Sequence, residues 1–178
     1  MYTAPYNPVA SASAARRGLI ILLLALAAIT LPAMARESDR NQKISVSADH
    51  FESSQQTGIT TLSGHVIIKQ GTLEATAGKG TAHANASGNT ERIVLNGNPA
   101  HLQQQMDDGS LMRARASIID YQVNGDTITL NGDAHVQQPG QGTFNGAHLV
   151  YNPTSGAIKG NGGKQGRVHL TLEPRKRK

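Results

Sequence analysis

The residues that could carry acid–base or metal chemistry in this sequence are a few carboxylate–imidazole neighbours and seven histidines. Asp49-His50 and Asp133-Ala134-His135 each bring the two groups used in general acid–base catalysis close together in the chain. The histidines stand singly, never at the H-x-H or H-E-x-x-H spacing of metal sites, at His50, His65, His83, His101, His135, His148 and His169. We interpret them as isolated polar residues on strands. The prediction is therefore no catalytic residue, no metal and no cofactor, and a protein that is not an enzyme.

The N-terminus has the three parts of a secretory signal peptide. Residues 1–17 contain no acid and end in Arg16-Arg17, the apolar run Leu19–Ile29 follows, and Ala33-Met34-Ala35 supplies a small-residue cleavage site. The run is short for a bilayer span, which needs about 20 residues, although a retained N-terminal anchor is the alternative. We expect cleavage after Ala35 and release into the periplasm. The sequence contains no cysteine, so neither a disulfide framework nor a lipid-modified cysteine is available.

The charge of the chain is concentrated at its ends. The formal net charge is +5, but Arg16 and Arg17 lie in the predicted signal and four more basic residues form the tail at 175–178. What remains is nearly neutral, whereas a nucleic-acid-binding domain shows a basic face on the fold itself. We expect the tail to be a solvated end, with contact to anionic lipid headgroups as the alternative.

The predicted domain, residues 36–174, carries the alternation of strands. Apolar residues recur at every second position in Ile44–Ala48, Leu62–Ile68, Ile128–Leu130, Ala134–Val136, Leu149–Tyr151 and Val168–Leu172. Turn-forming clusters separate them at Gln70-Gly71, 86–89, 107–109, 124–126, 139–142 and 152–156. The chain contains no Trp, two Phe and four Tyr, so its core is thin or is filled by something else. The pattern predicts an all-β protein.

The strands also repeat as units. Four segments, Ile44–Thr72, Leu73–Ser110, Leu111–Gly142 and Thr143–Pro174, each contain a strand, a turn and a Leu/Ile-x-Gly corner. The corners are Leu62-Ser63-Gly64, Leu95-Asn96-Gly97, Leu130-Asn131-Gly132 and Ile158-Lys159-Gly160. Glycine at a corner permits a bend or bulge. Units that cannot bury an apolar face alone must stack, so we expect bent hairpins in one long folded sheet. Its open edges would lie near Ile44–Asp49 and Val168–Leu172.

Several of these segments resemble the OstA-like family of lipopolysaccharide transport. Ile44–Asp49 followed by Leu62–Leu73 resembles the start of that domain, and Gly97-Asn98-Pro99-Ala100 resembles its G-x-P-A corner. Ala114–Tyr121 resembles its H-A-S-x-x-x-Y strand, with Arg115 replacing a common polar residue, and Leu130–Gln138 resembles its L-x-G-x-A-x-L-x-Q strand. The resemblance covers about Ile44 to Leu172.

The resemblance implies a twisted antiparallel β-jellyroll, open at both ends, that stacks head to tail and encloses the acyl chains of lipopolysaccharide. It implies LptC as the partner at the N-terminal edge and LptD at the C-terminal edge. By matching position, the lipid-binding residues would be Ile44, Val46, Leu102, Tyr121 and Val123, the last being smaller than the Leu expected there. From the alternation alone, these residues could equally be ordinary core.

Three other functions remain open at this point. The chain could be an LptC-like or LptD N-terminal-like module of the same system. It could be a β-repeat protein that binds or cleaves polysaccharide, although that function needs aromatic platforms or a carboxylate pair. It could also be a structural filament without a ligand.

Overall fold

Ten strands of one antiparallel sheet make up the described part of the chain. The computed structural model describes residue 39, residues 41–163 and residues 166–174, so the predicted signal peptide and basic tail lie outside the described residues. The strands are β1 (Ser45–Ser47), β2 (His50–Ser54), β3 (Ile59–Gln70), β4 (Leu73–Ala84), β5 (Thr90–Gln105), β6 (Leu111–Gln122), β7 (Thr127–Gln138), β8 (Gly142–Asn152), β9 (Ala157–Asn161) and β10 (His169–Leu172). Within these residues there is no helix of the length and apolarity that a membrane span requires.

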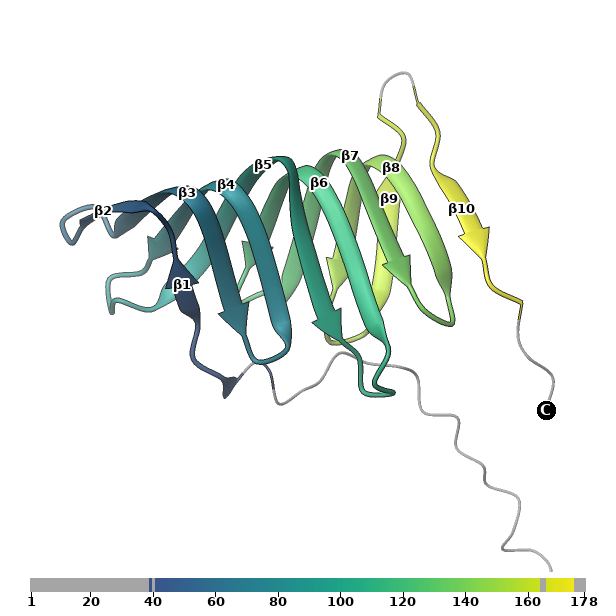
Figure 1. Ribbon diagram of the computed structural model, residues 1–178, viewed down its shortest axis with the longest axis horizontal. Coiled ribbons are helices and arrows are strands. Elements are labelled where there is room, and N and C mark those ends of the chain that lie inside the picture. The colour runs from purple at the N-terminus through teal and green to yellow at the C-terminus, as the bar shows by residue number, and fades with distance from the viewer. Residues whose placement is uncertain (1–38, 40, 164–165, 175–178) are drawn as a thin grey trace, which may run out of the picture. The chain divides into compact units, whose positions relative to one another are not determined.

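Between β3 and β8 the sheet order follows the sequence. Each of these strands pairs with the next one along the chain, so the connections between them are hairpins (Figure 1). All six predicted turn clusters lie at hairpin ends or at the turn between β8 and β9. The prediction of an all-β antiparallel fold is confirmed.

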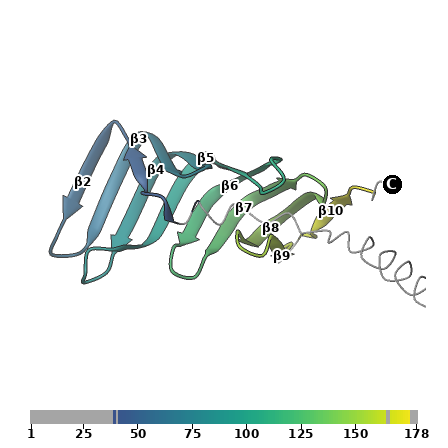
Figure 2. The ribbon, with the colours of Figure 1, turned by 90° about the horizontal axis from the view of Figure 1, so that it is seen from below.

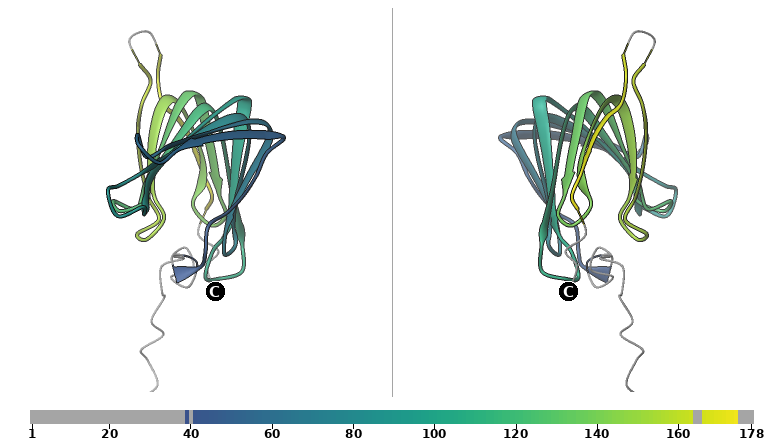
Figure 3. Two further views of the ribbon diagram at one scale, coloured as in Figure 1. Left: turned by 90° about the vertical axis from the view of Figure 1, so that its left-hand side faces the viewer. Right: turned by 90° about the vertical axis from the view of Figure 1, so that its right-hand side faces the viewer.

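The long strands bend in the middle, and the bends fold the sheet into two layers. The hairpin register shifts along each of the pairings from β3–β4 to β7–β8, at positions that include Ser63/Val66, Asn96/Ala100 and Asn131/Ala134. We call the layer that contains β2 and β9 the β2 layer, and the layer that contains β1 and β10 the β1 layer. Figure 3 looks along the sheet and shows the two layers joined at the bends and separate at the opposite side, the mouth.

Three of the four predicted corners are these bends. At Gly132 the backbone has φ +76° and the following Asp133 has φ +47°, and Gly64 and His65 repeat that pair of left-handed residues. A side chain on Gly132 would collide with Ser117 of the neighbouring strand. These positions therefore need glycine for both reasons.

The fourth predicted corner is wrong. Ile158-Lys159-Gly160 lies in β9, which pairs with β8 in regular register and does not bend. Glycine is needed at position 160 for another reason, because a Cβ there would collide with the side chain of Leu149. The opposite half of that last unit is instead made by a separate strand, β10, which pairs with the first half of β8.

Each end of the sheet consequently carries two short edge strands, one per layer. At the N-terminal end, β1 and β2 pair with the two halves of β3; at the C-terminal end, β9 and β10 pair with the two halves of β8 (Figure 2). The predicted edges at Ile44–Asp49 and Val168–Leu172 are thus present in the β1 layer. The sequence did not predict β2 and β9 as their counterparts.

Candidate functional site

The inward face of the β1 layer is a continuous apolar row that crosses eight strands. Neighbouring members are paired across the strands, in the order Val46, Ile68, Ala75, Leu102, Ala114, Val136, Phe144 and Leu170. The row is covered in its middle, where Leu102 is 4% exposed and Val136 is fully buried, and open at its ends, where Val46 is 44% and Leu170 is 54% exposed. An apolar path therefore runs through the sheet from one edge to the other.

A second row faces it from the β2 layer. It runs through Phe51, Leu62, Gly80, Leu95, Ile119, Leu130, Leu149 and Gly160. Phe51 begins this row and is 77% exposed, although it pairs with the buried Leu62. An aromatic ring with an inward direction and no cover at the N-terminal end belongs to the candidate site.

The prediction missed Phe51 because the inward alternation shifts by one residue. Ile44, Val46 and Ala48 point inward at even positions, and a bend at Asp49 then moves the inward direction to odd positions. The Asp49 amide N–H donates to the Gly64 carbonyl at 2.9 Å, which fixes that bend. The polar Asp49-His50 pair between two apolar stretches is the signal that could have located it.

The five predicted lipid-binding residues lie along the interior and do not gather at one point. Ile44 and Val46 lie at the N-terminal end, where Ile44 is half-buried against the core. Leu102 is in the buried middle of the β1 layer, and Tyr121 lies half-buried on the β2 layer between Ile93 and Ile128.

Val123 is not on a strand. It follows β6 in a turn and is partly exposed, and its amide N–H donates to the Glu91 carbonyl at 2.8 Å. Whether these five residues contact lipid stays a prediction.

At the mouth, side chains of the two layers meet. The Tyr151 hydroxyl of the β2 layer lies 3.9 Å from the Met106 sulfur, next to the end of β5 in the β1 layer. Both residues are buried, at 1% and 0% exposed. Burial, with a smaller contribution from the negative charge of Asp126, raises the pKa of Tyr151. Side chains of the two layers therefore pack against each other at this point of the mouth.

The carboxylate–imidazole pairs do not form a catalytic set. Asp49 contacts His65 at 2.7 Å, on side chains that are 48% and 89% exposed, and this is a surface ion pair. His135 and His148 each contact an asparagine, at 2.6 and 2.7 Å. Among the described residues, no group of three His, Cys, Asp or Glu converges on one point.

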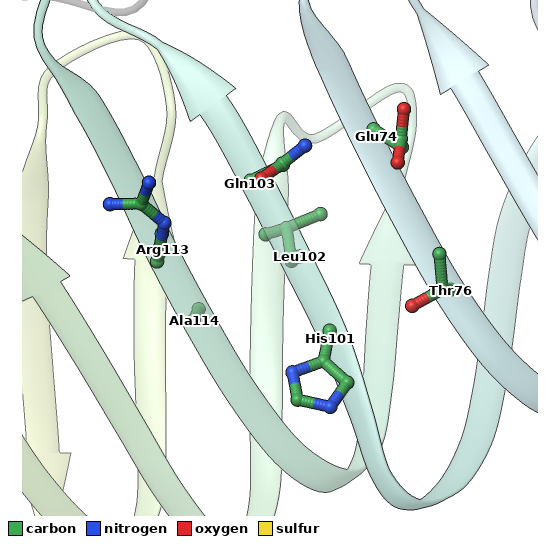
Figure 4. Close-up of a pocket in the computed structure, with 7 residues that line it drawn as sticks. All are labelled: Glu74, Thr76, His101, Leu102, Gln103, Arg113 and Ala114. Carbon is green, nitrogen blue, oxygen red and sulfur yellow. The ribbon is translucent and has the colours of Figure 1, made fainter.

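A hollow with charged side chains lies over the outer face of the β1 layer, and Leu102 and Ala114 of the apolar row also contribute to its lining. Figure 4 shows it over β4, β5 and β6, with Glu74, His101 and Arg113 among its lining side chains. Glu74 and Arg113 are register neighbours of Gln103, which points away from the inward-facing Leu102.

The fold and the rows define the class of this protein. A bent antiparallel sheet with an apolar interior, open at both ends, is an open β-jellyroll that can hold elongated apolar molecules. The model of the family described as "LptA/(LptD N-terminal domain) LPS transport protein" matches residues 45–157. The chain belongs to that family of lipopolysaccharide transport proteins.

Individual relatives agree with this assignment. The chain is 27% identical over 157 residues to the lipopolysaccharide export system protein LptA of Haemophilus influenzae, covering 87% of this chain and 91% of that protein. It is 30% identical over 154 residues to LptH of Pseudomonas aeruginosa, covering 82% and 87%. The crystal structure of that organism's LptH, the LptA-homologous periplasmic component, matches with a TM-score of 0.70 at 28% identity, over 77% of this chain and 99% of that one. Lipopolysaccharide transport is a non-enzymatic role.

Proposed function

We propose that this protein is a periplasmic carrier whose interior shields the acyl chains of lipopolysaccharide between the inner and outer membranes. The observation that carries the proposal is the row from Val46 to Leu170, which is apolar at every strand and exposed at both ends. Each methylene removed from water contributes about 0.8 kcal/mol, so several acyl chains in water would cost tens of kcal/mol. A continuous apolar path removes that cost along its whole length.

Lipid would enter between the layers. The buried residues of the two rows now cover one another, and the layers are joined at the bends. At the mouth, the contact between Tyr151 and Met106 is a side-chain contact and not a strand ladder. Side chains can repack at far lower cost than a ladder of backbone hydrogen bonds can be broken.

The edges support assembly by strand addition. Edge strands present unpaired N–H and C=O groups that can pair with another sheet. The N-terminal edge differs from the C-terminal edge, so copies that join through them grow head to tail without closing. We propose LptC as the partner at the β1–β2 edge, and LptD or a further copy at the β9–β10 edge. In the β1 layer, Val46 of one copy would then meet Leu170 of the next, and both side chains are exposed in the single chain.

Localisation in the periplasm is supported by the predicted signal peptide and by the similarity to LptH, a periplasmic component of lipopolysaccharide transport. The proposal requires cleavage after Ala35. N-terminal sequencing of the exported protein should give Arg36 as the first residue. Recovery of the Leu19–Ile29 run would contradict it.

Mass spectrometry of lipid extracted from the purified protein tests the function. We expect lipopolysaccharide at a stoichiometric level, and only background levels from a periplasmic β-protein purified in parallel. Polysaccharide without lipid would favour a polysaccharide-binding module, and no ligand at all would favour a filament protein. Family membership favours lipopolysaccharide over both.

A further inference from the structure

Three buried glutamines lie in one row near the mouth of the β1 layer. The strand registers pair Gln70 with Leu73, Gln104 with Met112 and Gln138 with Gly142. Continuing the β4–β5 and β6–β7 registers by one residue lines these pairs up across strands β3 to β8. A glutamine therefore occupies every second strand, with apolar residues between the first and the last. The three side chains are 7%, 3% and 0% exposed. They share the inward face with Ile68 and Leu102, two positions away along their strands.

Two amides of this row, those of Gln104 and Gln138, are short of hydrogen-bond partners. Both amide atoms of Gln138 and the Oε1 atom of Gln104 are buried without a partner. A buried amide left unpaired costs about as much as a lost hydrogen bond, and such groups are rare in folded proteins. An apolar residue at position 138 would give a more stable fold unless a group from outside the protein pairs with the amide.

The hydrogen bonds that Gln104 and Gln70 make show which chemical groups the amides of the row can bind. Gln104 donates its Nε2 hydrogen to the Asp39 carboxylate at 3.4 Å, and Gln70 donates to the Gln42 carbonyl at 3.3 Å. Asp39 is itself buried, and it also accepts a hydrogen bond from the Thr72 hydroxyl. The segment from Asp39 to Gln42 thus places oxygen acceptors against the first two glutamines. It reaches no described contact with Gln138.

We propose that the glutamine row is a polar binding rail for the uncharged linkage groups of an acylated sugar lipid. The proposal rests on the proposed function and adds a subsite to it. The amide and ester carbonyls and the hydroxyls that join acyl chains to a sugar would hydrogen-bond to Gln104 and Gln138. The chains themselves would lie along the neighbouring apolar row.

The chemistry of the row selects for such neutral groups. A primary amide both donates and accepts, which matches amides, esters and hydroxyls. Phosphate is bound by arginine or lysine in most proteins, and every side chain of the row is uncharged. The rail is therefore assigned to the linkage region and not to the phosphates of a headgroup.

The spacing of the row suits movement along the interior. Strands lie about 4.8 Å apart, so glutamines on alternate strands repeat every ~9.6 Å. Neutral hydrogen bonds are individually weak. A lipid could therefore exchange one amide for the next without leaving a deep energy minimum, as transport requires.

Replacement of the amide by an apolar side chain of similar length tests the rail. Gln138→Met and Gln104→Met/Gln138→Met would be compared with Gln137→Met, whose side chain is the exposed outward neighbour. Because no group of the protein pairs with the amide of Gln138, its removal should leave the melting temperature unchanged or raise it by a few degrees. The same change should weaken lipopolysaccharide binding about 3- to 10-fold, since a hydrogen bond is lost.

A second ligand separates the rail from the apolar path. Hexadecyltrimethylammonium, used below its critical micelle concentration, has an alkyl chain and no hydrogen-bonding group, and its affinity should be the same for the wild-type protein and all three variants. Equal lipopolysaccharide affinity for Gln138→Met and wild type would overturn the rail and leave the proposed function standing. Equal weakening for both ligands would also overturn it, because the variant would then have damaged the apolar interior. A wild-type protein that binds no lipopolysaccharide would refute the proposed function itself.

Discussion

The Tyr151 hydroxyl lies 3.9 Å from the sulfur of Met106, and this contact connects the two layers of the sheet where the bends do not. The two residues are 45 positions apart in sequence and come from opposite layers. A thioether is a weak hydrogen-bond acceptor, so the phenol is buried with little compensation. The contact is consistent with a mouth that can open.

Burial of Tyr151 predicts a pH dependence of stability above about pH 10. Its folded-state pKa is raised by burial and by Asp126 above the ordinary value of about 10. The protonated phenol is therefore favoured by folding, and this contribution is complete below about pH 10 and is lost as the pH rises further. Tyr151→Phe should remove the part of the stability loss above about pH 10 that comes from ionisation of this phenol.

Urea denaturation between about pH 8 and pH 11 measures the effect. We expect the midpoint of the wild-type protein to fall more steeply above about pH 10 than that of Tyr151→Phe. Tyr121→Phe, which leaves Tyr151 in place, is the matched control. If Tyr151→Phe and wild type fall in parallel, the phenol is not held in a buried site.

The corner at Gly132 predicts a specific cost for a methyl group. Gly132→Ala forces a left-handed conformation on a residue with a side chain and places Cβ against Ser117. Gly109→Ala has a similar φ of +79° but meets nothing within 4 Å. We expect Gly109→Ala to lower the free energy of unfolding by about 1 kcal/mol and Gly132→Ala by roughly 2–4 kcal/mol. Equal losses would mean that the bend tolerates a larger residue.

Crosslinking in cells tests the predicted lipid contacts. A photo-crosslinking residue at Val46, Ile44 or Tyr121 should capture lipopolysaccharide, because these positions lie on the inward face or next to it. The same probe at Asp107 or Asp108, in the exposed turn after β5, should capture far less. Equal labelling at both sets of positions would show that lipid does not follow the interior.

Removal of β10 tests assembly at the C-terminal edge. A chain that ends before Arg167 loses β10, whose four residues are all exposed, so the rest of the fold should remain. We expect growth at this edge to stop and LptC binding to persist, because the β1–β2 edge is unchanged. Light scattering over a concentration series measures the growth of oligomers, and pull-down with LptC and LptD measures partner binding.

The control for this truncation is removal of the basic tail alone. Loss of residues 175–178 should spare assembly, since the tail lies beyond β10 and its side chains add no ladder hydrogen bonds. Oligomers of the Arg167 truncation that match those of the full chain would exclude strand addition at β10 as the mechanism.

The local pattern of the sequence was enough to predict the all-β fold, the turns and three of the four corners. Side-chain alternation has a period of two in any strand, and turns and left-handed corners demand glycine, asparagine or aspartate locally. Ile158-Lys159-Gly160 is the corner that local pattern predicted wrongly. Its glycine is required by the nearby side chain of Leu149 on another strand and not by a bend of its own backbone.

Only the tertiary structure decided which inward residues become neighbours. The row of Gln70, Gln104 and Gln138 depends on the sum of several strand registers, each shifted by a bulge, and the inward direction of Phe51 depends on the bend at Asp49. The contact of Tyr151 with Met106 depends on the angle at which the bends fold one layer over the other. Alternation within one strand states which residues share a face, but the distances between residues of different strands arise from register and curvature, which are set by packing between strands far apart in the chain.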